Sequence, residues 1–448
     1  MLILVYLYIE QKMHSLCQIL SVFFMCTILN ANVYLKEGSF LQDDEIEETT
    51  LLVVSDLFKA AKVSHTPTVY FLVNRDINAA ATVQGTLIIF TGFILNCKNI
   101  NEFIGVLAHE TAHIKGAHSA LRDFHAGNAT IPGILAIALS GVAALATGNG
   151  EIFAAGAMGG LGMMERGVLK YSRAQEDTAD AGALTILEVL KWPADGLMTF
   201  LKTIDQKYNI RGLDPYLLTH PLTPSRIGKI QAYLKEHKNN YHVPLEYAKH
   251  FSRMRGKIAG FTQEPNKTLR DYAGQHSDEA RYGRAIAYYR LRKMDNLKRE
   301  LDLLLKDSPN DTYFLEIKGQ FEFESGKHKQ ALESFKRAKQ YRKKNSLGLD
   351  VMTSHALIEA KGDMNQVVDL LTPHLERDPS QVFGWRLLGI AYGKMGKTAD
   401  AAGCLAEAAF LMQDYKMAKS HALKAKQATK TSIRVRAEGL LKQLDKEE

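Results

Sequence analysis

The sequence predicts an α+β domain, mainly helical with a small antiparallel sheet, followed by an all-α array of helical repeats. Three observations support this prediction. Residues 69–73 and 86–90 are short runs of β-branched and aromatic residues, which are typical of strands. Apolar residues between Phe103 and Ile114 recur at helical spacing, and the last third of the chain repeats its glycines at a fixed interval. A length of 448 residues, 46% of them hydrophobic and 23% charged, fits two globular domains.

The N-terminus has the pattern of a targeting segment. Residues 16–29 are mostly apolar and are followed by small and polar residues, which predicts a secretory signal peptide over residues 1–31. A short membrane anchor that stays attached is the alternative, although a spanning helix needs about 20 apolar residues. An acidic run over residues 43–48 then opens an amphipathic helix that extends to about Lys62.

The run from His109 to His113 reads H-E-x-x-H inside the apolar helical pattern. Residues four apart share a helix face, so His109 and His113 can direct two imidazole nitrogens at one zinc ion. Glu110 lies beside the first ligand and can act as a general base on a water molecule. A chance match on a surface helix is expected only about 0.05 times in such a chain. We therefore expect one Zn²⁺ per chain in a zincin-like metalloprotease domain over residues 32–258.

A tetrahedral catalytic zinc needs a third protein ligand from another element. Glu176 and Asp180 share one face of a second apolar helix. Glu176 is the candidate ligand, and Asp180 can accept a hydrogen bond from the far nitrogen of a ligand histidine. Spacing alone favours a solvated helix face for this pair.

Three further motifs resemble those of the CAAX prenyl protease and HtpX superfamily of zinc peptidases, and together with H-E-x-x-H they occur along the chain in the same order as in that family. They are S-R-x-x-E-x-x-A-D over residues 172–180, T-H-P-x-x-x-x-R-I over residues 219–227, and Ile-Asn-Ala over residues 77–79. The resemblance implies that Glu176 is the third ligand. It also implies that His220 approaches the metal, as a latency plug or as a group that stabilises the oxyanion, with Arg226 anchoring its loop. From the residues alone, a structural turn histidine before Pro221 is equally compatible.

Metalloproteases of this kind hold the substrate backbone on an edge strand by β-addition. We therefore expect residues 82–89 near the cleft, and the candidate substrate-binding residues are Asn78, Thr82, Gly85 and Thr86. A purely structural hairpin is the alternative.

Residues 131–164 form an almost uncharged apolar stretch around Gly148-Asn149-Gly150. They fit either a buried helical hairpin or an apolar lid that makes peripheral membrane contact and controls substrate entry.

The cysteines limit the possible zinc ligands, and the net charge limits the possible binding partners. Two of the four cysteines lie in the expected signal peptide, and no C-x-x-C pair is present, so zinc would use His and Glu. The formal net charge of +7 is modest, and its basic clusters lie in the helical repeats. This favours a solvated repeat surface over nucleic-acid binding, with an acidic membrane surface or acidic partner left open.

Gly319 and Gly326 recur as Gly389 and Gly396, 70 residues later, and His355 falls midway. A period of 34–36 residues is that of tetratricopeptide repeats. We expect a linker over residues 259–279 and repeats over residues 280–448, ending in a basic capping helix. The groove of such an array binds peptides or partner proteins, although packing or dimerisation is the alternative.

A secreted zinc protease domain joined to tetratricopeptide repeats is similar to the group of periplasmic β-barrel assembly-enhancing proteases. The resemblance implies a periplasmic endopeptidase that hydrolyses misfolded or stalled outer-membrane proteins in quality control. It also implies that the repeats dock substrates or the barrel-assembly machinery, with no nucleic-acid partner. The alternative function is a non-catalytic, repeat-based chaperone or adaptor whose protease domain is latent or plugged. A prenyl-protein protease would need several spanning helices that this sequence does not contain.

Overall fold

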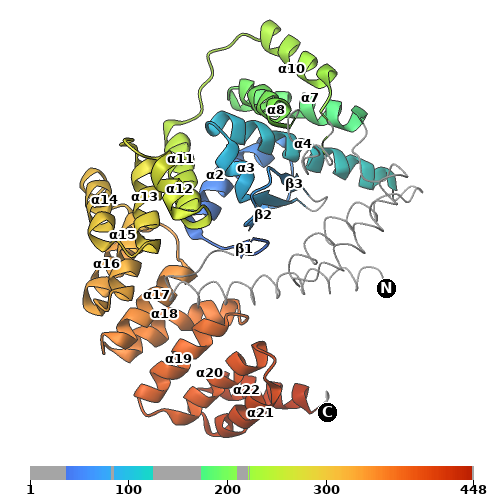
Figure 1. Ribbon diagram of the computed structural model, residues 1–448. Helices are drawn as coiled ribbons and strands as arrows, with labels where there is room; N and C mark the ends of the chain where they lie inside the picture. The colour runs from blue at the N-terminus through green and yellow to red at the C-terminus, as the bar shows by residue number, and fades with distance from the viewer. Residues whose placement is uncertain (1–36, 82–84, 125–172, 209–219, 221, 446–448) are drawn as a thin grey trace. The chain divides into compact units, whose positions relative to one another are not determined.

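The structure is a computed structural model that describes residues 37–81, 85–124, 173–208, 220 and 222–445 (Figure 1). The described chain forms two compact units, with the boundary between Ala287 and Tyr288. This boundary falls within α13 (Asp278–Arg290), later than the expected start of the repeats at residue 280. The expected signal peptide and residues 131–164 lie outside the described residues. No helix of the described part is both long and apolar enough to cross a bilayer.

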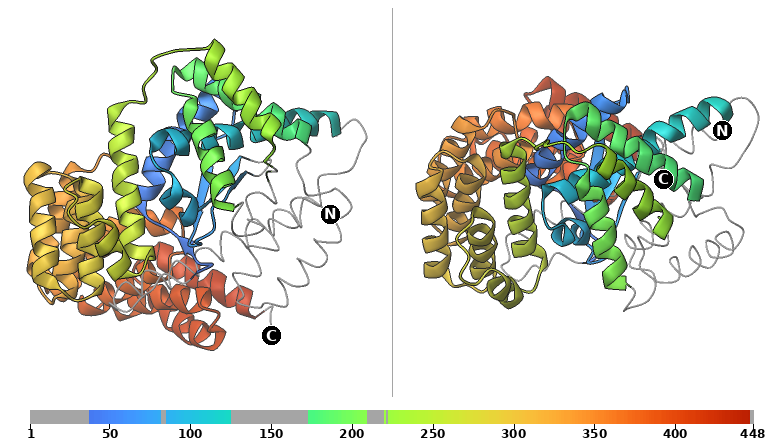
Figure 2. Two further views of the ribbon diagram at one scale, coloured as in Figure 1. Left: turned by 45° about the horizontal axis from the view of Figure 1, so that its top comes forward. Right: turned by 90° about the horizontal axis from the view of Figure 1, so that it is seen from above.

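The first unit is built around α4 (Ile100–Phe124), which packs against α2 (Asp44–Ala61), α7 (Arg173–Leu190) and α8 (Asp195–Tyr208). Figure 2 shows α4 beside α7 in views from two further directions. The other described helices that lie wholly within this unit are α3 (Thr91–Asn96), α10 (Pro224–Glu236), α11 (Leu245–Thr262) and α12 (Pro265–Asp271). The expected helix from the acidic run is α2, whose first turn is capped by the Asp43 carboxylate.

Small residues let two helices approach α4 closely. A Cβ atom added to Gly182 of α7 would lie 2.8 Å from the Cβ of Ala112, between the two histidines of the H-E-x-x-H run. A Cβ added to Gly105 would lie 2.5 Å from the backbone nitrogen of Leu197 in α8. Both distances are too short for a real side chain, so the backbones of α4, α7 and α8 meet because glycine occupies these positions.

The sheet has four strands in the order β1 (Phe40–Leu41), β2 (Thr68–Leu72), β4 (Thr86–Phe90) and β3 (Ala79–Ala81). The two predicted strands are present as β2 and β4, and the α+β fold class is confirmed. The expectation of an antiparallel sheet is wrong in one respect, because β2 and β4 are parallel. The reason is β3, which lies between β2 and β4 in the sequence and pairs antiparallel with β4. The chain therefore reverses its direction at β3 and again at β4, so that β4 runs in the same direction as β2. Residues 86–89 are therefore interior, and β3 lies at the end of the described sheet.

The expected linker over residues 259–279 is instead helical. It contains the end of α11, all of α12 and the start of α13. The buried hydroxyl of Thr268 donates a hydrogen bond to the carbonyl of Ala259, which joins α12 to α11. The segment is therefore an ordered part of the first unit.

The second unit is a series of helices, coloured yellow to red in Figure 1. Those that follow α13 are α14 (Met294–Asp307), α15 (Thr312–Glu324), α16 (His328–Tyr341), α17 (Leu347–Glu359), α18 (Met364–Arg377), α19 (Val382–Lys394), α20 (Thr398–Leu411), α21 (Tyr415–Lys424) and α22 (Thr431–Leu444). The starts of α15, α17 and α19, at residues 312, 347 and 382, are 35 residues apart, which agrees with the predicted period. Gly319 of α15 lies against the ring of Phe335 in α16, which explains a recurring glycine. The assignment to tetratricopeptide repeats stays a prediction.

Candidate metal centre

Helices α4 and α7 bring three side chains that could bind a metal together in the interior of the first unit. His109 Nε2 lies 3.0 Å from His113 Nε2, because the two residues are one helical turn apart. Glu176 of α7 faces both: its Oε2 is 3.5 Å from His109 Nε2, and its Oε1 is 3.2 Å from His113 Nε2. His109 and Glu176 are fully buried, and His113 is 8% exposed. The two imidazoles and the carboxylate are therefore in mutual contact and shielded from solvent.

His220 completes the cluster from a separate part of the chain. Its Nδ1 lies 3.2 Å from Glu176 Oε1, and its Nε2 lies 3.5 Å from Glu110 Oε1. One ligand atom from each of His109, His113, Glu176 and His220 can be chosen so that all lie within 4.8 Å of one another. His220 is only 1% exposed, so the fourth side of the cluster is covered by an imidazole.

The dimensions of this cluster fit a zinc ion. Zinc–ligand bonds of about 2.0–2.2 Å in a tetrahedral site place neighbouring ligand atoms about 3.3–3.6 Å apart. The 3.0, 3.2 and 3.5 Å separations among the histidine nitrogens and Glu176 oxygens lie close to this range. Two imidazoles and one carboxylate are also the donor set of known catalytic zinc sites. His109, His113 and Glu176 can therefore hold the metal with small adjustments.

Glu110 has the surroundings expected of a group that acts on a solvent molecule. It is fully buried, and neither of its carboxylate oxygens accepts a hydrogen bond from the described residues. Burial raises the pKa of Glu110, so its affinity for a proton exceeds that of a solvated glutamate. A buried carboxylate without a hydrogen-bond donor is costly in a purely structural role.

A carboxylate and a guanidinium contact the candidate ligands on the side away from the cluster. Asp180 Oδ1 lies 2.9 Å from His109 Nδ1, which leaves the other nitrogen of this imidazole directed at the cluster. Arg226 of α10 donates hydrogen bonds from Nε and Nη2 to the two Asp180 oxygens, over 2.7 and 2.9 Å. Its Nη1 lies 2.6 Å from Glu176 Oε2. Arg226 thus contacts both Glu176 and Asp180 while being only 1% exposed itself.

These contacts explain the electrostatics of the site. Burial alone would raise the pKa of Asp180, but hydrogen bonds from Arg226 and His109 outweigh it and lower the pKa to about 2. Burial would likewise lower the pKa of His109, yet its hydrogen bonds with Asp180 and Glu176 raise that pKa to about 9. Burial lowers the pKa of His113 to about 3, so this imidazole is neutral. Neutral His113 has the lone pair that a metal ligand needs.

The candidate substrate-binding residues lie on or beside the sheet. Asn78 precedes β3 and is 9% exposed, with an Oδ1 atom that accepts no hydrogen bond from the described residues. Gly85 precedes β4 and has a φ of +86°, which favours glycine. Thr86 begins the interior strand β4, whose backbone pairs with a strand on each side, so β-addition cannot occur there. Thr82 lies outside the described residues. β3 packs against α4, and it is the strand next to the metal-centre helix that sequence reasoning missed.

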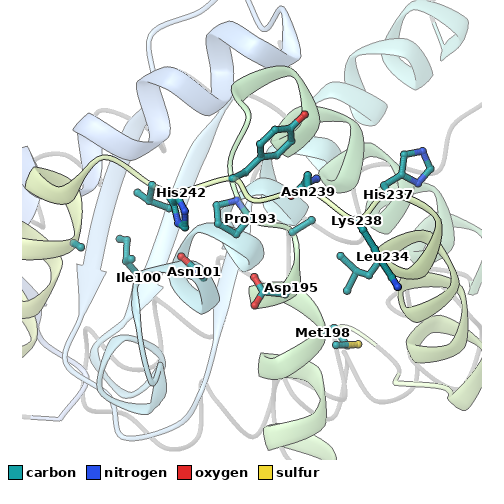
Figure 3. Close-up of a pocket in the computed structure, with 14 residues that line it drawn as sticks. Ile100, Asn101, Pro193, Asp195, Met198, Leu234, His237, Lys238, Asn239 and His242 are labelled. Carbon is teal, nitrogen blue, oxygen red and sulfur yellow. The ribbon is translucent and has the colours of Figure 1, made fainter.

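A cavity separate from this cluster lies in the first unit at the start of α4. Its volume is about 680 Å³ and its walls come from the starts of α4 and α8 and from the segment that joins α10 to α11. Asn101 and Asp195 lie near its centre, with His242 on one side and Lys238 on another (Figure 3). None of its lining residues belongs to the histidine–carboxylate cluster.

Comparisons with known proteins agree with this geometry. Residues 42–234 match the model of peptidase family M48. The chain is 24% identical to the beta-barrel assembly-enhancing protease of Yersinia pestis over 341 residues, which cover 74% of this chain and 69% of that protein. The protein of the same name from Escherichia coli K12 is 24% identical over 337 residues, covering 73% and 67%. A putative beta-barrel assembly-enhancing protease of Vibrio cholerae is 25% identical over 273 residues, covering 58% and 55%.

Proposed function

We propose that this protein is a zinc-dependent endopeptidase with one zinc per chain, because residues 42–234 match the model of peptidase family M48. His109, His113 and Glu176 would hold the metal. The observation that carries the proposal is the buried contact of these three side chains at 3.0–3.5 Å, beside a Glu110 carboxylate without a hydrogen-bond donor. Zinc, when bound, would supply a Lewis acid that lowers the pKa of a water toward about 7 and stabilises negative charge on the peptide oxygen.

Glu110 is the proposed general base. Its raised pKa suits a carboxylate that takes a proton from the attacking water and then donates it to the leaving amine. Asp180 would keep His109 in the tautomer that presents Nε2, and Arg226 would hold Asp180 and Glu176 in place. The substrate backbone would lie extended along β3. Residues 79–81 form an edge strand of the described sheet, which can pair with a peptide, and they pack against α4.

The relatives named as beta-barrel assembly-enhancing proteases suggest the setting in which such an enzyme works. We propose that it acts in the periplasm, after export through a signal peptide over residues 1–31. Its substrates would be misfolded or stalled outer-membrane proteins. The helices of residues 288–445 would dock substrates or the barrel-assembly machinery, as arrays of stacked helix pairs do.

The test is proteolysis of an unfolded protein by the full chain and by Glu110→Gln. The substitution keeps the size of the side chain but removes the base, so cleavage should fall at least about 100-fold. Circular dichroism and zinc content by elemental mass spectrometry should match the parent. A Glu110→Gln protein that cleaves at the parent's rate would refute the mechanism, and a freshly purified, folded parent without zinc would refute the metal centre.

A second function, a latent protease that serves as a chaperone or adaptor, is favoured by the position of His220. Its imidazole covers the fourth side of the ligand cluster, 3.2 Å from Glu176. The two functions predict different results for His220→Ala. If His220 only plugs an active site, the variant should cleave unfolded protein faster than the parent. If cleavage is absent in both proteins and the parent still suppresses aggregation, the adaptor function is supported.

A further inference from the structure

The net positive charge of this protein comes from its C-terminal part, residues 288–448. Residues 288–448 contain 29 Lys and Arg against 22 Asp and Glu, so they carry the entire +7 of the chain. Within them, residues 415–437 contain seven Lys and Arg and no acidic residue. This stretch comprises α21, the short 3₁₀ turn Ala425–Gln427 and the first half of α22.

One face of α21 packs inside the unit and the opposite face is exposed. Ala418 and Ala422 are fully buried and belong to small apolar clusters with residues of α20 and α22. Helical spacing places Lys416, Leu423 and Lys424 on the side opposite these alanines. Because alanine supplies the packing of this helix, its outward side chains have no role in the core.

Several outward side chains are apolar. Twelve large apolar side chains are prominently exposed among the described residues, and five of them fall within residues 412–435. They are Met412, Tyr415, Met417, Leu423 and Val435, which are 45–58% exposed. Scattered exposed apolar residues are ordinary, but a concentration of them among cations marks an interaction surface.

The cations at this surface are not engaged in local ion pairs. Lys416, Lys424, Lys426 and Lys430 are exposed, and none forms an ion pair with a carboxylate of the described residues. Their neighbours differ, since Lys419 pairs with Asp445 and Arg436 with Glu407. Lys416 and Lys424 share the outward side of α21, and Lys426 and Lys430 follow within six residues of Lys424. We name these four lysines, together with the exposed Met417 and Leu423, the lysine surface.

We propose that the lysine surface binds the anionic headgroups of a phospholipid bilayer. Charge complementarity supports this occupant, because each lysine near an anionic membrane contributes favourably and the contributions accumulate. Met417 and Leu423 lie between the lysines along the chain and can enter the headgroup–acyl boundary, as the apolar side of a surface-bound helix does. An acidic protein partner is less favoured, because the four cations are all lysines and lack the planar fork that matches a carboxylate.

Co-sedimentation with lipid vesicles tests this proposal on the full chain. Vesicles of phosphatidylcholine alone are compared with vesicles that contain about one-third phosphatidylglycerol, at about 0.1 M NaCl. Binding by other apolar segments appears in the neutral vesicles and is subtracted. We expect binding that depends on phosphatidylglycerol and weakens strongly at about 0.5 M NaCl. Each lysine should contribute about five-fold in partitioning, so K416Q/K424Q/K426Q should lose about 100-fold.

A matched variant, K361Q/K394Q/K397Q, removes the same charge from exposed lysines elsewhere in the second unit and should retain binding. A second variant, M417S/L423S, should weaken binding at both salt concentrations, because it removes apolar contact rather than charge. Equal losses in the two lysine triples would overturn the proposal in favour of diffuse charge. Competition by about 10 mM inorganic phosphate would indicate a site for a free ion instead. Absence of any phosphatidylglycerol-dependent binding would also overturn it and leave an acidic protein as the partner.

Discussion

Arg226 offers the sharpest test of how the candidate metal centre is stabilised. Its guanidinium is 1% exposed and contacts two carboxylates, Glu176 at 2.6 Å and Asp180 at 2.7 Å, that are themselves almost completely buried. Arg226→Gln removes the charge and leaves both acids in the interior. Breaking a buried ion pair in this way costs about 3–5 kcal/mol, a large part of the roughly 5–15 kcal/mol that stabilises a typical domain.

The same helix provides a matched control. Lys229 pairs with Asp177 of α7 at 2.7 Å, but its side chain is 62% exposed. Lys229→Gln therefore removes a cation that also joins α10 to α7, without leaving a buried charge. Exposed pairs contribute about 0–1 kcal/mol, so this variant should unfold close to the parent.

The assay is urea denaturation in the presence of a chelator and again with zinc. With the chelator, Arg226→Gln should lose about 3–5 kcal/mol, or about 6–20 °C in the thermal midpoint. Zinc should reduce this loss, because it supplies a new positive partner for Glu176. Equal losses for Arg226→Gln and Lys229→Gln would refute the argument that burial makes Arg226 important. A loss that zinc leaves unchanged would refute the link between Arg226 and the metal ligands.

Three further predictions concern the support of the ligands, helix packing and pH. Asp180→Asn should weaken zinc binding about 10–100-fold in a chelator competition, because it removes the carboxylate beside His109 Nδ1; unchanged affinity would contradict that role. Gly182→Val should cost about 1–3 kcal/mol in urea denaturation, because its Cβ would lie 2.8 Å from that of Ala112. Its control is Gly228→Ala on α10, where no atom lies within 4 Å of the added Cβ and no loss is expected. Burial and the nearby Asp44 and Asp43 raise the pKa of Glu47 to about 8, so the folded state prefers the protonated form. The parent should therefore lose stability as the pH rises from about 4.5 to 8, and Glu47→Gln should remove that loss; parallel stability profiles from pH 4 to 9 would contradict the assignment.

The parts of this protein that sequence predicted well are those with local periodicity. His109 and His113 lie on one helix face because four residues make about one turn, and the recurrence of Gly319 at Gly389 follows from close helix pairs. The prediction that Glu176 is a metal ligand needed the family motif, because its own spacing also fits a solvated face. β3 was missed because a run of three alanines has little strand propensity.

Contacts between distant segments could not be read from the sequence. Arg226 was expected only to anchor a loop, and its contacts with Glu176 and Asp180 depend on how α10 packs on α7. The linker prediction over residues 259–279 failed for a similar reason. This stretch is polar and holds a proline, yet Pro265 begins α12, a position that proline favours, and Thr268 is buried against α11.

Two side chains of this site, Arg226 and His220, differ in the energetic cost of moving them away. Arg226 follows His220 by six residues, and α10 begins between them, with the Thr223 hydroxyl accepting a hydrogen bond from the Arg226 backbone. Moving Arg226 away would leave two buried carboxylates without their cation, which is costly whether or not a substrate is present. Moving His220 away removes an imidazole from Glu176 Oε1, the oxygen that a metal would also attract. With a metal bound, displacement of His220 is therefore the less costly change. It follows that displacement of His220 can open the cluster while Arg226 of α10 keeps Glu176 and Asp180 in place.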